Sequence, residues 1–423
     1  MGEIFSKIQN ASIDDVVKSI QKVIQIKGFS GTEKDRIKYM MKIARKLKYN
    51  RIYTDELGNL IAEMRFGNGK GPKVIFTGHM DVVGADEREW DKETPPFGGV
   101  IKDGKIYGRG ASDMLSADVA MLYAIGILKS FNPENLNGTA YFVGSVCEEF
   151  FEGVAFLETL KKIQPDYVVI GESTDKKLNI GQRGRLEVEI TAYGISIHSA
   201  KGKTVYNAIE QAAELINKIY NEFEEDEDEL LGKRIIVPTD IKIPVGGGGG
   251  LDGRGGNSTV PNRVIVNYDM RTLVQDSEES IMELMSKYIK PMEEKYSKLF
   301  NNYKAPTIRY ASDGIKTYTG VLIEQIKFAP AWKMNRDASI VQKSLEGLKK
   351  VGIDNVEISA YSFCTDGSAS IKYKKLFPDK NLELVGYGPG KESLAHIINE
   401  YVEIEDVKRV FKAYMGMLYE YLS

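Results

Sequence analysis

The segment Val74–Gly84, VIFTGHMDVVG, places two side chains that could do chemistry directly after an apolar run. Val74-Ile75-Phe76 is typical of a buried strand, and His79 and Asp81 follow it, two residues apart from each other. The chain of 423 residues contains only three histidines. A histidine beside an apolar run is more often a packed or surface side chain than a metal ligand, so other residues must decide the role of His79.

Carboxylates and a second histidine follow other expected strands. In chain order these residues are Asp113 before an expected helix, Glu148-Glu149 after strand 139–146, Glu172 at the end of strand 166–172, and His396 after strand 381–387. In open α/β sheets, ligands bind outside the carboxyl ends of the strands, so we expect these side chains to converge. Each alone would indicate little in a chain with 60 acidic residues, whereas their convergence at one sheet edge indicates a site.

Two imidazoles and several carboxylates form a mixed set of nitrogen and oxygen donors. Such a set suits Zn²⁺, with Co²⁺ or Mn²⁺ as substitutes. One tetrahedral ion could not use all of these groups, whereas a carboxylate that bridges two ions roughly 3.5–4 Å apart would employ them. A closed structural zinc site normally uses thiolates, and an ordinary acidic surface cluster would not draw ligands from so many strands.

The elements that must position these side chains alternate between strands and helices. Apolar residues recur at helical spacing in MLSADVAMLYAIGILKSF, 114–131, and in VAFLETLKKI, 154–163, and expected strands separate the two. A last helix is expected at 404–422. This alternation predicts an α/β fold with a doubly wound, mainly parallel sheet.

The pattern changes between residues 182 and 330. The segment GRLEVEITAYG alternates like a half-exposed strand. The expected order is strand 184–194, helix 204–222, strand 262–273 and helix 277–294. This order predicts a smaller α+β domain, ferredoxin-like with an antiparallel sheet, inserted into a discontinuous catalytic domain of residues 1–181 and 331–423.

Composition excludes several classes of protein. A net charge of −3 gives no reason to expect a nucleic-acid partner or an anionic membrane. No apolar run has the length of a membrane span, and the N-terminus lacks the apolar region of a signal peptide. Two cysteines, Cys147 and Cys364, are too few for a disulfide framework, which favours a reducing, cytoplasmic setting.

Five ordered segments resemble the metal-site motifs of a known family. TGHMDVV, GRGASDM, CEE, GES and AHIINE are similar to those of the dinuclear zinc peptidases that include acetylornithine deacetylase, succinyl-diaminopimelate desuccinylase and aminoacylase. YTGVLIEQIKFAPAWKMNRDAS and FCTDGSAS are most similar to the YgeY-type branch, often described as selenium-metabolism-linked hydrolases. The resemblance implies hydrolysis of the amide bond of a small N-acyl amino acid or short peptide.

The same resemblance implies a role for each residue of the site. For two zinc ions per subunit it implies five ligands: the bridging carboxylate of Asp113, then His79 and Glu172 at the first ion, and Glu149 and His396 at the second. Glu148 would be the general base. The Asp81 carboxylate would accept a hydrogen bond from the second ring nitrogen of His79 and fix its tautomer. The bond Asp113–Met114 is expected to be cis.

Residues of the insert gain roles only through the resemblance. His198, in YGISIHSAKG, would donate to the oxygen that becomes negative in the transition state, and in dimeric relatives this histidine comes from the partner subunit. The resemblance therefore also implies a homodimer formed through the inserted domain.

Three further residues would hold a substrate carboxylate. They are Asn257 in GGNSTVPN, Arg271 in YDMR and Gly388 in the turn GPG. From the residues alone, Asn257 could merely shape a turn before Pro261, and Arg271 could pair with Asp269 instead. The substrate is expected to be a small molecule or short peptide with a free carboxylate.

Two alternatives remain open. An aminopeptidase or dipeptidase can share the dinuclear core, although the segments around His198 and Asn257 favour relatives that carry the insert. A catalytically inactive, metal-binding relative would keep the scaffold, and the presence of Glu148 argues against it. The acyl group and side chain of the substrate are not specified by these motifs.

Overall fold

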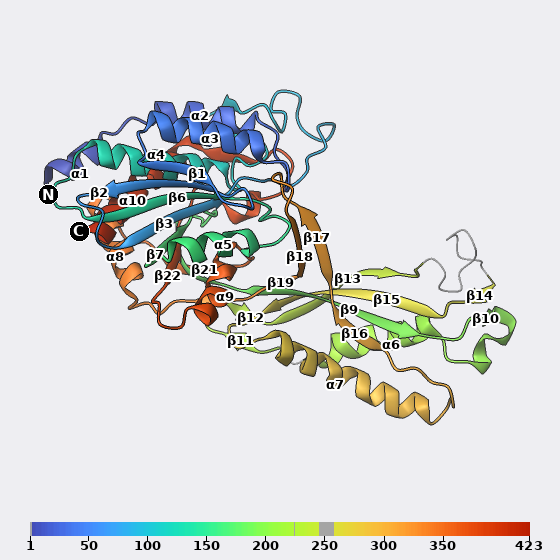
Figure 1. Ribbon diagram of the computed structural model, residues 1–423. Helices are drawn as coiled ribbons and strands as arrows, with labels where there is room; N and C mark the ends of the chain where they lie inside the picture. Colours follow the sequence, from blue (N-terminus) through green and yellow to red (C-terminus); the bar gives the residue numbers. More distant parts are fainter. Residues whose placement is uncertain (1, 224, 245–257) are drawn as a thin grey trace. The chain divides into compact units, whose positions relative to one another are not determined.

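The computed structural model describes residues 2–223, 225–244 and 258–423, which form two compact units (Figure 1). The first unit extends to Gln182 and also contains Gly314–Glu324 and Trp332–Ser423. The second unit contains Arg183–Asp313 and Gln325–Ala331. Among the described residues, no helix is long and apolar enough to cross a membrane.

The first unit is built on a nine-stranded sheet with the order β1-β2-β6-β3-β7-β22-β8-β20, and β21 beside β8. Its strands are β1 Arg51–Thr54, β2 Leu60–Phe66, β3 Lys73–His79, β6 Gly138–Ser145, β7 Tyr167–Ile170, β8 Leu178–Gln182, β20 Trp332–Lys333, β21 Ile358–Tyr361 and β22 Glu383–Gly386. β3 is parallel to β6 and β7, and β22 is parallel to β7. The carboxyl ends of these central strands therefore lie at one edge.

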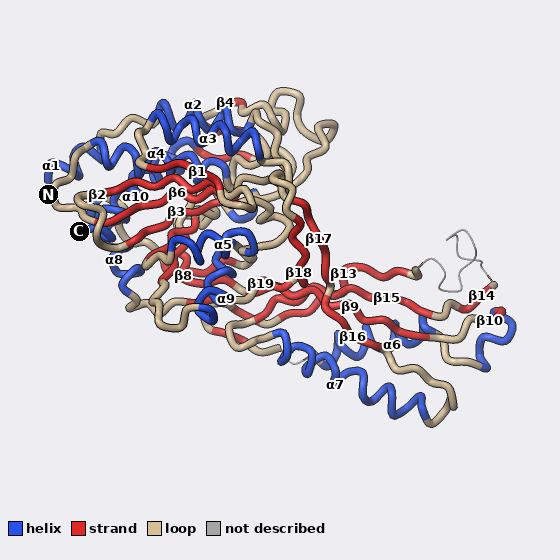
Figure 2. The backbone as a smooth tube through the Cα atoms, in the orientation of Figure 1, coloured by secondary structure: helices blue, strands red, loops and turns tan. Residues whose placement is uncertain are grey.

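Helices cover both faces of this sheet (Figure 2). They are α1 Gly2–Gln9, α2 Asp14–Ile24, α3 Lys34–Lys46, α4 Leu115–Ser130, α5 Val154–Ile163, α8 Ser339–Lys350, α9 Ala369–Leu376 and α10 Ile404–Leu422. The alternation of β3 shows the two faces: Ile75 joins the apolar cluster that includes Phe156 of α5, whereas Phe76 packs edge-on against Tyr414 of α10. A small sheet of β4 Val100–Lys102, β5 Lys105–Tyr107 and β23 Tyr401–Glu403 completes the unit.

The second unit has a five-stranded sheet in the order β13-β15-β9-β16, with β19 beside β9. Its main elements are β9 Gly184–Tyr193, α6 Ala208–Glu222, β13 Ile235–Lys242, β15 Arg263–Thr272, α7 Glu278–Ser297, β16 Thr307–Tyr310 and β19 Phe328–Ala329. Short pairs are formed by β10 Ile197–His198 with β14 Thr259–Val260 and by β11 Glu227–Asp228 with β12 Gly232–Lys233. A further pair, β17 Ser312–Lys316 with β18 Leu322–Ile326, has its residues divided between the two units, because Gly314–Glu324 belongs to the first. All ladders of the larger sheet are antiparallel.

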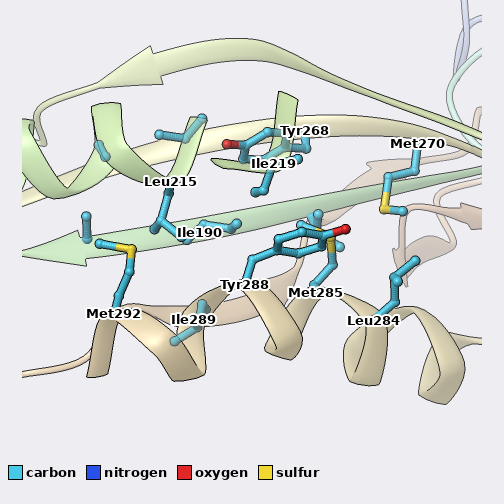
Figure 3. Packing of buried hydrophobic residues seen from close by; sticks show 14 of the residues in the cluster. Ile190, Leu215, Ile219, Tyr268, Met270, Leu284, Met285, Tyr288, Ile289 and Met292 are labelled. Atoms are coloured by element: carbon cyan, nitrogen blue, oxygen red, sulfur yellow. The ribbon is translucent and has the colours of Figure 1, made fainter. Parts of the chain in front are cut away.

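Strict alternation in β9 and β15 builds the core of this unit (Figure 3). One face of the sheet, with Ile190 and Tyr268, packs against Leu215 of α6 and Met285 of α7. The other face carries charged side chains such as Arg185, which pairs with acids on its own and the neighbouring strand. One apolar face covered by helices is the α+β layer that the sequence predicts.

The predicted fold class is confirmed, with one difference in how the chain is divided. The expected insert, 182–330, included Gly314–Glu324, which the structure places in the first unit. The reason lies in hydrogen bonds to the loop before β2. Tyr318 Oη donates to the carbonyl of Gly58, and Thr319 Oγ1 donates to that of Glu56, both at 2.8 Å.

Candidate metal centre

His79 is the last residue of β3, and its ring is buried at the carboxyl edge of the sheet. Its Nδ1 lies 2.9 Å from the backbone carbonyl of Asp81, which can only accept, so Nδ1 carries the proton. Its Nε2 faces Asp113 Oδ1 at 2.9 Å, Glu172 Oε1 at 3.4 Å and Glu148 Oε2 at 3.9 Å. The ring therefore presents Nε2 to three carboxylates.

The side chain of Asp81 does something different from what the sequence predicts. Its Oδ1 is 3.8 Å from His79 Nδ1, too far for a hydrogen bond, because the Asp81 carbonyl already occupies that position. The carboxylate instead accepts the N–H groups of Glu148 at 3.2 Å and Glu149 at 3.1 Å, and the hydroxyl of Ser30 at 2.7 Å. Asp81 thus orients His79 through its backbone and the adjacent Glu pair through its side chain.

Asp113 lies between the two imidazoles. Its Oδ1 is 2.9 Å from His79 Nε2 and its Oδ2 is 3.1 Å from His396 Nε2. His396 Nε2 also lies 3.0 Å from Glu149 Oε2. The peptide bond Asp113–Met114 is cis, as expected. One carboxylate that offers each oxygen to a different imidazole has the geometry of a bridging ligand.

The structure brings together the five proposed metal ligands and the proposed general base, which are His79, Asp113, Glu148, Glu149, Glu172 and His396. Ligand atoms of His79, Asp113 and Glu149 lie within 4.8 Å of one another, and so do those of His79, Glu148 and Glu172. Among the described residues, Glu148 Oε1 and Glu149 Oε1 are buried without a hydrogen-bond partner. Orphaned carboxylate oxygens that converge with imidazole nitrogens fit divalent cations.

The electrostatics of the cluster also call for positive charge. Burial, and then the charge of Asp113, raises the pKa of Glu149 and brings the pKa of Glu172 to about 8. Burial raises the pKa of Glu148 well above its usual range, with Glu172 adding to the effect. Hydrogen bonds to Asp113 and Glu149 raise the pKa of His396 to about 10. Crowded carboxyl groups that retain protons are the groups a cation would deprotonate.

Glu400 and Arg109 support the cluster and carry no role in the sequence-based prediction. Glu400 is fully buried, and its Oε1 accepts three backbone N–H groups, those of Gly110, Ser112 and Asp113, at 3.1, 2.8 and 3.1 Å. Its Oε2 accepts Arg109 Nη1 at 2.7 Å, and Arg109 Nη2 donates to the His396 carbonyl at 3.1 Å. The pair ties the loop of Asp113 to the loop of His396. Its only sequence signal is the position of Glu400 at the end of AHIINE.

The remaining predicted residues have their own local contacts. In the second unit, exposed His198 accepts the N–H of Ala200 at its Nδ1, at 3.2 Å. Arg271 Nε lies 3.1 Å from Asp269 Oδ1, which is the alternative pairing that the sequence left open. In the first unit, the N–H of Gly388 donates to Thr174 Oγ1 at 3.3 Å, and a side chain at Gly388 would collide with the carbonyl of Gly171. Asn257 lies outside the described residues.

Known proteins match this chain along most of its length. The model of Peptidase family M20/M25/M40 matches residues 75–420. The YgeY protein of Escherichia coli K12 is 25% identical over 393 residues, covering 91% of this chain and 89% of that protein. An acetylornithine deacetylase of Dictyostelium discoideum is 28% identical over 380 residues, which is 84% of this chain and 80% of that protein.

Solved structures share the fold at low sequence identity. The aminopeptidase PepT of Bacillus cereus superposes with a TM-score of 0.71 at 17% identity, covering 97% of this chain and 99% of that one. Human carnosine dipeptidase 1 superposes with a TM-score of 0.69 at 16% identity, covering 99% and 98%.

Proposed function

This chain belongs to Peptidase family M20/M25/M40, a family of metal-dependent hydrolases, and on that premise we propose the reaction that its site performs. The reaction is hydrolysis of the amide bond of a small N-acyl amino acid or short peptide, with Glu148 as general base. The observation that carries this proposal is the position of Asp113 between His79 and His396, with the carboxylate of Glu148 beside His79.

The divalent metal centre would hold two Zn²⁺ ions, for which Co²⁺ or Mn²⁺ could substitute. Asp113 would bridge them, with His79 and Glu172 at one ion and Glu149 and His396 at the other. When bound, the ions supply Lewis acidity and lower the pKa of water. The short distances from each imidazole to one oxygen of Asp113 support two positions rather than one.

Glu148 would move the proton. Its carboxylate accepts a proton from the attacking water and returns it to the nitrogen that leaves, so no net proton is gained by the enzyme. Without metal, burial raises the pKa of Glu148, and a bound cation beside the carboxyl group would favour the ionised form that can accept a proton. The hydrogen bond that the N–H of Glu148 donates to Asp81 Oδ1 holds the backbone of Glu148 in place.

His198 would donate to the carbonyl oxygen of the scissile amide. The N–H of Ala200 occupies its Nδ1, so in the neutral ring the proton lies on Nε2, which is then a donor. The substrate carboxylate would be bound by Arg271, Asn257 and Gly388. To bind it, Arg271 would have to give up its ion pair with Asp269, and the N–H of Gly388 would have to give up its hydrogen bond to Thr174.

We further propose a homodimer formed through the second unit. β13 ends the strand order, so its outer backbone edge has no partner strand among the described residues. Val237 and Ile241 on this strand are 48% and 56% exposed, and Tyr220 of α6 is 84% exposed. Apolar side chains along an open strand edge favour pairing with a second copy.

A reducing, cytoplasmic location is proposed as well. The buried thiols of Cys147 and Cys364 support it.

The test is a substrate screen of the metal-loaded protein. Enzyme loaded with Zn²⁺, Co²⁺ or Mn²⁺ is assayed on N-acetyl, N-succinyl and N-carbamoyl amino acids and on dipeptides, and bound metal is counted in the same samples. We expect hydrolysis of at least one class, its loss with a chelator and its recovery with metal. Two bound metals without hydrolysis of any class would favour the catalytically inactive alternative.

A further inference from the structure

Glu33 is a fully buried carboxyl group that the proposed mechanism does not use. It stands directly before α3, and its Oε1 accepts the N–H of Gly31 at 2.9 Å and that of Cys147 at 3.0 Å. The Cys147 thiol lies 3.6 Å from the same oxygen. Burying a carboxyl group is costly, so a group that contacts a distant turn through one oxygen calls for an explanation.

The turn that Glu33 contacts carries the proposed general base. Three consecutive N–H groups of this turn point at two buried carboxyl groups: that of Cys147 at Glu33, and those of Glu148 and Glu149 at Asp81. Cys147 has a φ of 57°, in the left-handed region that non-glycine residues seldom adopt. The hydrogen bond to Glu33 therefore holds a strained residue immediately before Glu148.

The segment that carries Glu33 is held by hydrogen bonds on both sides of it. Arg36, in the first turn of α3, is buried and donates three hydrogen bonds, to the carbonyls of Ile26 at 2.7 Å, Gly28 at 2.8 Å and Met80 at 2.9 Å. Ser30 Oγ donates to Asp81 Oδ2 at 2.7 Å. Residues 26–36 are thus fixed to the end of β3, and a fixed support can transmit its position to the turn.

We propose that Glu33 is a positioning residue that sets the direction in which Glu148 enters the metal centre. What matters is the length of the side chain, because Oε1 must extend to the N–H of Cys147. The other oxygen, Oε2, is buried with no hydrogen-bond partner among the described residues and makes no hydrogen bond to the turn. This inference rests on the proposed role of Glu148.

Three variants distinguish the effect of the length of the Glu33 side chain from the effect of its charge. Glu33→Gln keeps the length and one carbonyl-type acceptor without the charge, Glu33→Asp keeps the charge but is one methylene shorter, and Glu33→Ala removes both. Misplacing a catalytic group by about 1 Å can cost about a hundredfold in rate. We expect kcat of Glu33→Gln to stay within about threefold of wild type, and kcat of Glu33→Asp and Glu33→Ala to fall about tenfold or more.

The accompanying measurements distinguish positioning from simple destabilisation. KM should change by less than about twofold and metal content should not change, because no proposed metal ligand is altered. Glu383→Ala is the control: Glu383 accepts the N–H of Ile340 at 2.7 Å, at the amino end of β22. This variant should lose stability while its kcat remains that of wild type.

Two results would overturn the inference. One is a wild-type kcat in both shortened variants; the other is a Glu33→Asp variant more active than Glu33→Gln, which would assign the role to charge. If Glu33→Ala does not fold, the comparison of Gln with Asp still decides. A wild-type protein that hydrolyses no amide contradicts the proposed function instead, before any variant is compared.

Discussion

At the scale of single residues, the two histidines of the metal centre differ in how they are held. His79 is buried and faces Asp113, Glu172 and Glu148. The side chain of His396 is 51% exposed, and its Nε2 lies 3.1 Å from Asp113 Oδ2 and 3.0 Å from Glu149 Oε2. We therefore expect the proposed ion at His396 to be easier to remove than the proposed ion at His79.

The variant His396→Ala should bind one metal ion per chain instead of two. The variant removes a proposed ligand of the proposed second ion only. Its affinity for that ion should therefore fall by more than the roughly 10–100-fold that follows the loss of a residue that merely supports a ligand. Metal analysis after gel filtration measures the stoichiometry. Retention of two ions at wild-type affinity would remove His396 from the ligand set.

Metal affinity should rise with pH. In the metal-free protein the pKa of Glu172 is about 8 and that of His396 about 10, so both groups carry protons at pH 7. Metal binding must displace these protons, so raising the pH from 6 to 8 favours the bound state. Calorimetry in two buffers with different heats of ionisation counts the protons released on metal binding. If no protons are released and the metal affinity is the same at pH 6 and pH 8, the expectation is wrong.

At the scale of elements, the site depends on loops that are fixed from outside. The loop before α4 presents Asp113, and the loop before β23 presents His396. Glu400 and Arg109 join the two through buried hydrogen bonds. Residues that touch no substrate can therefore control the separation of the proposed metal positions.

Glu400→Gln should weaken both stability and metal binding. Breaking a buried ion pair leaves Arg109 uncompensated, at a cost of about 3–5 kcal/mol. Glu87→Gln is the control, because both side chains of the Lys27–Glu87 pair at 2.8 Å are exposed and the pair should contribute less than about 1 kcal/mol. Denaturant unfolding compares the two, and equal losses in stability would argue against a special role for Glu400.

The sequence predicted the elements with strong periodicity. The helices 154–163 and 404–422 have the bounds that apolar spacing indicates, and β9 follows its alternation. No such periodicity marks β13, whose segment IIVPTDIK contains a proline and is largely exposed. An edge strand of this kind is specified by pairing with β15 rather than by its own pattern.

The predicted site shows the same division. His79, Glu148 and Glu172 could be found because each lies at the end of a strand of the sheet or within three residues after it. Glu33 and Glu400 could not, because each acts on backbone N–H groups 114 or about 290 positions away along the chain. A single glutamate among 60 acidic residues has no spacing that marks such a contact.

At the scale of the whole molecule, the chain folds into two units with separate cores, and the metal-ligand cluster found among the described residues lies in the first. His198 belongs to the second unit.

The variant His198→Ala should lower kcat by about 10²–10³-fold with metal content unchanged, since one proposed donor to a developing oxyanion is lost. Steady-state kinetics of the metal-loaded variant measure this; an unaltered kcat would leave His198 without a catalytic role.

The homodimer can be tested on the open edge of β13. A double variant, Val237→Lys with Ile241→Lys, places charges on the two exposed side chains and should shift the protein to monomer. Leu299→Lys is the control, because Leu299 is 65% exposed just beyond α7, which contacts β16 at the opposite end of the sheet. Sedimentation velocity gives the mass, and a double variant that stays dimeric would place the interface elsewhere.

The central claim, that Glu148 moves the proton in a metal-dependent amide hydrolysis, has one direct test. It is the kcat of Glu148→Gln on the best substrate, measured at the same bound metal content as wild type. The account predicts a loss of about 10²–10⁴-fold, because general-base catalysis disappears while the ligands remain. A kcat close to wild type with both ions bound would contradict it.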